Sequence, residues 1–105
     1  MAAGQIEGGV AQGIGFALYE KVVWNDGRML NHQMTNYIIP TAVDVPPIRV
    51  FFVGSADAPE PKGLGELPMD GPAPAIVNAI EDAIGVSINH VPLMPEDLMK
   101  MVSAV

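Results

Sequence analysis

Apolar residues recur at helical spacing in the first stretch of the chain, residues 4–21. Successive members are separated by four, four, three and one positions, so they share one face of a helix: Ile6, Val10, Ile14, Ala17 and Leu18. The spacing predicts a helix at this end of the sequence.

Four glycines interrupt the same stretch: Gly8, Gly9, Gly13 and Gly15. Each glycine inside a helix costs about 0.5–1 kcal/mol relative to alanine. Because glycine lets another backbone or a ligand approach closely, we interpret these positions as sites of dense packing. The alternative is a loose, glycine-rich lead-in.

The next residues favour extended structure. An apolar run and a second short segment flank Asn25-Asp26-Gly27, and an Asp-Gly pair favours the positive φ angles of a tight hairpin turn. A β-rich run from Ile48 to Val53 follows an approach that contains Pro40, Pro46 and Pro47. Prolines cannot donate to a central ladder, so the sequence predicts a hairpin, then an extended loop, then a further strand.

A long loop and two helices complete the predicted order. Residues 55–72 are rich in proline and glycine and are predicted to contain an ordered or mobile loop of roughly 15 residues, a length that in compact domains is usually functional or disordered. The low aromatic content and the apolar flanks favour a functional loop. Asp70 is predicted to cap a helix that begins near Pro72 and ends at Gly85. The predicted buried stripe of this helix is Ala75, Ile76, Ala79, Ile80 and Ala83.

After a short extended piece, a last helix is expected to start at Pro95, with Glu96 and Asp97 in its first turn. The fold class predicted for residues 1–105 is therefore α+β, in a single domain.

Composition adds the expectation of a partner. Half of the 105 residues are apolar and 16% are charged, which is unusually apolar for one small soluble domain. Either the apolar core is unusually large or part of the apolar surface is covered by a partner. The net charge of −7, with five scattered Lys and Arg, argues against binding to nucleic acid or to an anionic membrane.

The sequence also contains no Cys, no apolar run of the roughly 20 residues that span a bilayer, and no signal-peptide pattern. We therefore expect a protein without a membrane span, in the cytoplasm.

Glu66 is the most interesting titratable residue. The two histidines, His32 and His90, lack any close ligand spacing, so we expect no metal site built from this chain alone. The Gly63-Leu64-Gly65 stretch lacks the residues of a phosphate loop. Glu66 follows it among apolar neighbours, and a carboxyl held in apolar surroundings has a raised pKa, as a general base requires. A solvated loop glutamate is the alternative.

Three blocks of the sequence resemble a known family. They are GQIEGGVAQGIGFALYE, NYIIPTAVDVPPIRVFFV and PKGLGELPMDGPAPAIVNAIEDAIGVSINHVPLMPEDL, and together they extend from about Gly4 to Leu98. In this order they are similar to the C-terminal end of the molybdenum-binding large subunit of the xanthine dehydrogenase and aldehyde oxidase family. That family includes isoquinoline oxidoreductases and aerobic carbon monoxide dehydrogenase.

The resemblance implies roles for four residues. Glu66 matches the glutamate of the family's G-[VL]-G-E motif, which lies beside an oxygen ligand of molybdenum and acts as general base when an electron-poor carbon is hydroxylated. Gly63 and Gly65 would allow the backbone to pass close to the cofactor. Gln5 resembles a glutamine that hydrogen-bonds the pterin, and an amide can both donate to and accept from a pterin edge. Alternatively, Gln5 is a surface residue near a chain end.

Another matching block is expected to be structural. Tyr37, Pro40 and Asp44 fit the family's Y-x-x-P-x-x-x-D-x-P pattern. A proline-fixed crossing between elements needs such residues without any catalysis.

The family's large subunits are several times longer than this chain, so the resemblance implies a C-terminal fragment or split piece. It implies molybdopterin, with or without a cytosine nucleotide, in the complete subunit, and iron-sulfur clusters and FAD on partner subunits or domains. The substrate would be a small molecule such as an aldehyde or N-heterocycle. Alone, the chain is expected to bind no cofactor, to be inactive and to self-associate through exposed apolar surface. A noncatalytic interaction or assembly domain that keeps the fold remains the alternative.

Overall fold

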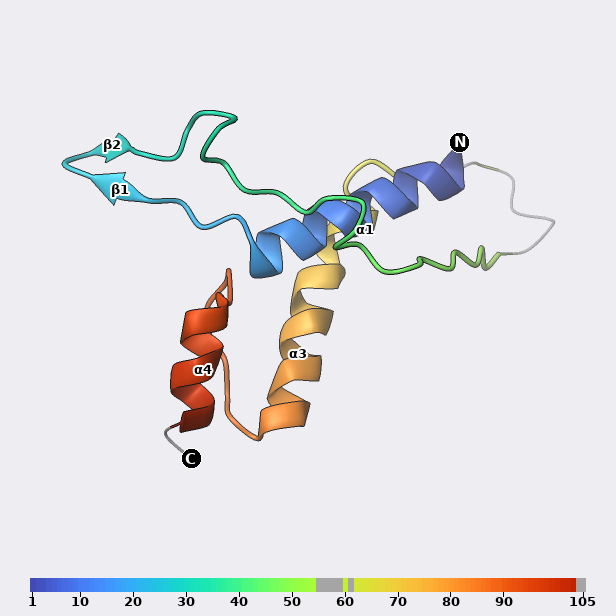
Figure 1. The fold of residues 1–105 in the computed structure, drawn as a ribbon. Coiled ribbons are helices and arrows are strands. Elements are labelled where there is room, and N and C mark those ends of the chain that lie inside the picture. The colour runs from blue at the N-terminus through green and yellow to red at the C-terminus, as the bar shows by residue number, and fades with distance from the viewer. Residues whose placement is uncertain (55–59, 61, 104–105) are drawn as a thin grey trace.

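The structure, a computed structural model, describes residues 1–54, 60 and 62–103. Its elements are α1 (Ala2–Leu18), β1 (Trp24–Asn25), β2 (Arg28–Met29), α2 (Leu67–Asp70), α3 (Pro72–Ile84) and α4 (Pro95–Ser103) (Figure 1). The predicted α+β class is thus correct in part, because this portion of the chain is mostly helical with one short hairpin. Residues 55–59 and 61 of the predicted long loop lie outside the described residues, and its last part forms α2.

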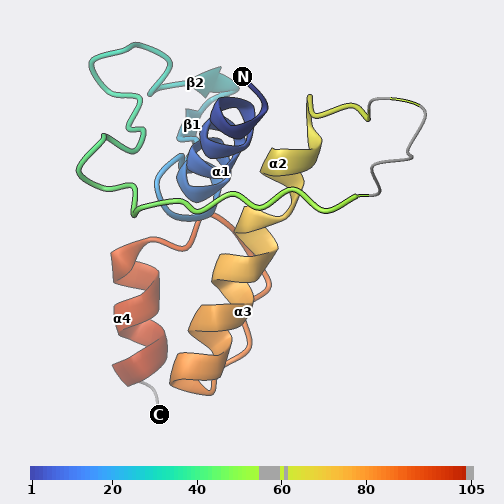
Figure 2. The same cartoon turned by 90° about the vertical axis from the view of Figure 1, so that its right-hand side faces the viewer.

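The helix α1 is the element against which α2 and α3 pack (Figure 2). Its buried residues are Gly9, Gly13, Ile14, Gly15 and Ala17. A Cβ added to Gly9 would lie 2.6 Å from Pro68 Cβ, and one added to Gly13 would lie 2.7 Å from Pro72 Cβ. The predicted helix is confirmed, and its glycines are contact positions as predicted, except for Gly8. Gly8 is exposed, and an added Cβ there would meet nothing described within 4 Å.

The C-terminal part of the chain returns to the end of α1. The N–H of Leu93 donates to the carbonyl of Ala17 at 2.7 Å. The core lies between α1 and this C-terminal part. Its buried apolar side chains belong to α1, to the start of α3 and to the segment before α4: Ile14, Ala17, Ala73, Ile88 and Leu93. In Figure 2, α3 and α4 extend away from the same side of α1.

Local signals placed the hairpin and two helix boundaries correctly. Asp26 and Gly27 have φ angles of 47° and 75°, and Trp24 pairs with Met29 in an antiparallel ladder, as the Asp-Gly turn predicts. The helix α3 ends at Gly85, whose φ is 70° and whose N–H donates to the carbonyl of Glu81 at 2.8 Å. The last helix begins at Pro95 as predicted.

The strand predicted from Ile48 to Val53 is not formed within the described chain. These residues are extended, but in the described part of the chain only β1 and β2 pair as strands. A strand is defined by hydrogen bonds to a neighbour, and a β-prone sequence cannot form one without a partner.

The predicted cap of α3 is also wrong. Asp70 is the last residue of α2, and Gly71 continues with helical angles of φ −82° and ψ −37°. An N-cap requires a non-helical residue, and the backbone from α2 into α3 provides none at Asp70.

The buried stripe predicted on α3 fails as well. Ala75, Ala79 and Ala83 are exposed and Ile76 and Ile80 are half-buried, because α1 and α4 reach only part of this face.

Large apolar side chains lie open over much of the surface. Val53 is fully exposed, Phe51 is 80% exposed, and Trp24 on the hairpin is 63% exposed. A core with five buried apolar residues among those described, beside so much open apolar surface, agrees with the compositional expectation that another surface covers part of this chain. None of the described helices combines the length and the apolar character needed to cross a bilayer.

Candidate functional site

The structure brings together the two segments that carry the predicted site residues. Gln5 lies in the first turns of α1, and Gly65 lies directly before Glu66 and α2, 60 positions away in the sequence. The side-chain amide of Gln5 donates from Nε2 to the carbonyl oxygen of Gly65 at 3.2 Å. This hydrogen bond fixes the start of α1 against the backbone that leads into Glu66.

Close helix packing holds the same arrangement. The Cβ position of Gly9 lies 3.1 Å from the carbonyl carbon of Pro68 and 3.2 Å from the amide nitrogen of Met69. One turn later, the Cβ position of Gly13 lies 2.7 Å from Pro72 Cβ and 2.9 Å from Pro72 Cγ. Two points of contact on one helix face fix the direction of the segment as well as its distance. The glycines of α1 thereby position the loop that contains Glu66.

Glu66 sits at the N-cap position of α2, and its carbonyl accepts a hydrogen bond from the N–H of Met69 at 2.9 Å. Its side chain makes no capping hydrogen bond and is exposed. Leu67 is 67% exposed, and Gly65 is exposed too. The apolar surroundings predicted for Glu66 are therefore not formed by the described residues. The sequence correctly marks its neighbours as apolar but cannot say whether they enclose it.

Gly63 and Gly65 have no local reason to be glycine in the described structure. A Cβ added at either position meets nothing described within 4 Å. Neither residue has the positive φ angle that favours glycine, unlike Gly27 and Gly85. The backbone beside Glu66 thus presents an open, unobstructed edge, which suits close approach by a group from outside the described residues.

Gln5 retains hydrogen-bonding capacity beyond its bond to Gly65. The residue is exposed, and among the described residues the amide oxygen has no hydrogen-bond partner. An amide with one N–H engaged still offers an acceptor oxygen and a second N–H. The donor and acceptor set, next to the open edge at Gly63 and Gly65, fits the polar rim of a pterin.

A second polar cluster ties the chain after the hairpin to the end of α1. The hydroxyl of Tyr37 donates to Glu20 Oε2 at 2.5 Å, and this bond raises the pKa of Tyr37 above its ordinary value. Asp44 Oδ2 accepts from the N–H of Thr41 at 2.8 Å and from its hydroxyl at 2.7 Å. These hydrogen bonds, led by that of the hydroxyl, lower the pKa of Asp44.

The contacts of this cluster agree with a structural role for the Y-x-x-P-x-x-x-D pattern. Pro40 also packs on α1, with its Cδ 3.0 Å from the Cβ position of Gly15. Glu20, the partner of Tyr37, was not identified from the sequence. Both residues lie in connecting segments, and nothing in their separation of 17 positions could have paired them.

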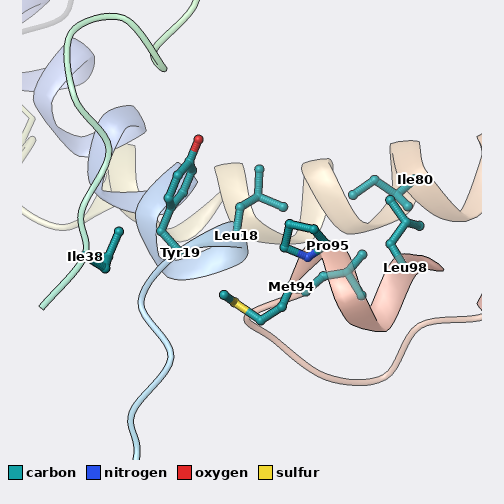
Figure 3. Close-up of a pocket in the computed structure, with 8 residues that line it drawn as sticks. Leu18, Tyr19, Ile38, Ile80, Met94, Pro95 and Leu98 are labelled. Atoms are coloured by element: carbon teal, nitrogen blue, oxygen red, sulfur yellow. The ribbon is translucent and has the colours of Figure 1, made fainter. Parts of the chain in front are cut away.

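A cavity of about 350 Å³ opens at the other end of α1 (Figure 3). It is lined by Leu18, Tyr19, Ile38, Ile80, Leu93, Met94, Pro95 and Leu98. Leu18 follows Gln5 by 13 positions on α1, which corresponds to about 20 Å at 1.5 Å per residue. With a tyrosine hydroxyl as its one titratable group, this apolar cavity is separate from the segment that contains Glu66.

Among the described residues, neither His32 nor His90 belongs to a ligand cluster. His32 Nδ1 lies 2.8 Å from the carbonyl of Met29. In the searched portion of the structure, no group of three or more His, Cys, Asp or Glu residues is placed to hold a metal ion.

Comparison with known proteins gives matches along most of the chain. A family model described as a molybdopterin cofactor-binding domain matches residues 1–46, which include Gln5 but not Glu66. The chain is 38% identical over 104 residues to the xanthine dehydrogenase molybdenum-binding subunit of Escherichia coli O157:H7, covering 93% of this chain and 14% of that protein. It is 34% identical over 104 residues to the aldehyde oxidoreductase molybdenum-binding subunit of Escherichia coli (strain K12), with coverages of 93% and 14%.

A solved structure matches as well. The crystal structure of quinoline 2-oxidoreductase from Pseudomonas putida 86 superposes with a TM-score of 0.83 and 35% sequence identity, over 96% of this chain and 14% of that chain. The chain therefore spans about one seventh of the length of each of these three relatives.

Proposed function

Because the chain is homologous to part of the molybdenum-binding subunit of the xanthine dehydrogenase, aldehyde oxidoreductase and quinoline oxidoreductase family, we propose that it supplies the segment of a molybdopterin-dependent oxidoreductase that holds the general base. In this proposal it is the C-terminal portion of the subunit. The reaction is hydroxylation of an electron-poor carbon, in an aldehyde or an N-heterocycle, with water as the source of oxygen.

The observation that supports this most directly is the hydrogen bond from Gln5 to Gly65. It joins the segment matched as a molybdopterin cofactor-binding domain to the loop with the candidate base, although they are 60 positions apart. In this proposal Gln5 binds the pterin through its free amide groups, and Gly63 and Gly65 leave space for the cofactor to approach. A bound molybdopterin centre would supply the oxidation, by accepting two electrons from the substrate carbon.

The proposed role of Glu66 is to accept a proton. Its carboxylate takes up the proton that the attacking, water-derived oxygen loses as it bonds to the substrate carbon. The backbone on both sides of Glu66 is held, by Gln5 before it and by the Gly9 contact with Pro68 after it. A base held in this way keeps its position relative to any group bound along the open edge.

The remaining parts of the enzyme are proposed to come from outside this chain. They are the rest of the molybdenum-binding subunit, iron-sulfur clusters and FAD on partner subunits or domains, and the small-molecule substrate. Alone, the chain is expected to bind no cofactor, to show no turnover and to self-associate. A cytoplasmic location is a further expectation drawn from the sequence. The resemblance allows a pterin with or without a cytosine nucleotide.

A second candidate is a noncatalytic interaction domain that keeps the fold, and the exposure of Glu66 favours it. Replacing Glu66 separates the two. The variant Glu66→Gln is prepared in the assembled subunit, together with Asp70→Asn, which removes the same charge from an exposed carboxylate four residues later.

We expect kcat of Glu66→Gln to fall by about 100- to 10,000-fold, the usual effect of losing a general base, with molybdenum content unchanged. The Asp70→Asn variant should retain its turnover. Unchanged turnover in Glu66→Gln would remove this residue from the mechanism and favour the noncatalytic candidate.

A further inference from the structure

The segment from Ile48 to Val53 is an apolar, extended run without a neighbour on much of its surface. Phe51 and Phe52 are 80% and 64% exposed, and Val53 is fully exposed. Figure 2 shows this part of the chain, in green, as an extended line with no strand beside it. Two aromatic side chains and a valine left open in succession are unusual for a surface in contact with water.

The backbone of this segment is equally unpaired. In the described part of the chain, no hydrogen bond involves a main-chain N–H or C=O of residues 48–53. Pro46 and Pro47 precede it, and neither has an N–H, so main-chain donors for pairing begin only at Ile48. β-branched and aromatic residues dominate the run, as they do in strands. The segment thus has the composition, the conformation and the free hydrogen-bonding groups of a strand.

We propose that residues 48–53 add as a β-strand to the edge of a sheet in the remaining part of the molybdenum-binding subunit, an inference that rests on the assembly proposed above. The relatives supply the argument for this occupant. The quinoline 2-oxidoreductase chain contains the same fold over 96% of this chain, yet this region makes up 14% of its length. Most of a relative's polypeptide therefore lies outside the matched region and can provide the sheet.

The side-chain pattern favours a sheet edge over a simple apolar groove. A peptide lying in a groove needs one apolar face, with polar residues on the other. Here Ile48, Val50 and Phe52 alternate with Arg49, Phe51 and Val53, so apolar groups project on both faces. A strand that is apolar on both faces is typical of sheets covered on both sides.

Hydrogen exchange of the assembled subunit tests the proposal without any substitution. The chain is assembled with the rest of the subunit, as one polypeptide or as several, and exchange of the amides of residues 48–53 is followed by mass spectrometry. A synthetic peptide of residues 45–54 provides the unpaired reference. We expect amides at alternate positions to exchange at least about 100-fold more slowly in the assembly. Exchange as fast as in the peptide overturns the proposal.

Proline substitutions provide the second test. Consecutive N–H groups of a strand point to opposite edges, so Val50→Pro and Phe51→Pro each remove one donor from a different edge. Val50→Ala and Phe51→Ala shorten the same side chains but keep the N–H. We expect at least one proline variant to lower the yield of assembled subunit at least tenfold relative to its alanine counterpart. Proline variants that both assemble as well as the alanine variants contradict strand addition.

The outcomes separate this inference from the proposed function. If the chain does not assemble with the rest of the subunit, the proposed function fails and the strand addition fails with it. If the assembly forms and turns over while residues 48–53 exchange freely, strand addition alone fails. In the assembled subunit, a photo-crosslinking residue in place of Phe51 that labels a second copy of this chain would overturn the choice of occupant.

Discussion

The contacts of Gly9 and Gly13 on α1 allow a sharp test of whether this helix positions Glu66. Gly8 and Gly9 are neighbours on the same helix, but they face different surroundings. A Cβ on Gly9 would lie 2.6 Å from Pro68 Cβ, 3.1 Å from Pro68 C and 3.2 Å from Met69 N, whereas one on Gly8 would meet nothing described within 4 Å. The substitutions Gly9→Ala and Gly8→Ala therefore make the same chemical change in two different environments.

The expected magnitudes follow from two opposing effects. Alanine in place of a helical glycine stabilises the helix by about 0.5–1 kcal/mol, and this gain applies at both positions. Overpacking costs about 1–3 kcal/mol, and it applies only at Gly9, because a contact of 2.6 Å with a proline ring cannot be relieved by rotating a flexible side chain. Gly8→Ala should thus stabilise the protein. The difference between the two variants isolates the contact and should amount to about 1–3 kcal/mol.

Urea unfolding of each variant, followed by helical circular dichroism, measures this difference in the free energy of unfolding. Turnover of the assembled subunit provides a second measurement, since a shift of Pro68 also displaces Glu66, and a displacement of about 1 Å can lower the rate about 100-fold. Equal stabilisation of both variants would show that α2 does not pack on Gly9, and the positioning of Glu66 by α1 would then lose its main support.

Two further predictions concern hydrogen bonds. Gln5→Leu removes the donor to Gly65, and we expect less molybdopterin in the assembled subunit but a stability loss of no more than about 1 kcal/mol at this exposed site. The control is Gln12→Leu, which replaces another exposed glutamine of α1. Equal cofactor content in both variants would contradict a role for Gln5. Thr41→Val removes the hydroxyl that contributes most to lowering the pKa of Asp44, so that pKa should rise towards its ordinary value of 3.8 in an NMR titration. Because the pKa of Asp44 is lower in the folded state, the stabilisation by these bonds is present at pH values above the ordinary pKa and is lost as the pH falls through the folded-state pKa. If the pKa of Asp44 does not move in Thr41→Val, the Thr41 hydroxyl is not the cause of its lowering.

Features set by residues close in sequence could be predicted. The Asp26-Gly27 turn, the end of α3 at Gly85 and the start of α4 at Pro95 each depend on the backbone preferences of one or two residues. The glycines of α1 indicated close packing because their cost within a helix requires compensation. The partners in that packing, Pro68 and Pro72, could not be identified, since the sequence does not say which distant segment approaches.

Features that depend on which distant segment packs against a residue were predicted poorly, as the surroundings of Glu66 and the strand predicted at residues 48–53 show. The β-rich composition of residues 48–53 is real, but a strand needs a second strand, and the described chain offers none to it. The apolar residues around Glu66 are present in the sequence, yet Leu67 is 67% exposed in the structure. In both cases the local sequence is suited to a neighbour that the described residues do not contain.

Positioning and enclosure are therefore separate contributions to the candidate site. Gln5, Gly9 and Gly13 hold the backbone around Glu66 by contacts within this chain. Nothing described covers the carboxylate, and a base in contact with water is surrounded by competing proton donors and acceptors. If the proposed function is correct, the surface that excludes water from Glu66 must come from the same assembly that pairs with residues 48–53. Loss of that pairing should consequently lower turnover, although among the described residues no hydrogen bond joins the segment to Glu66.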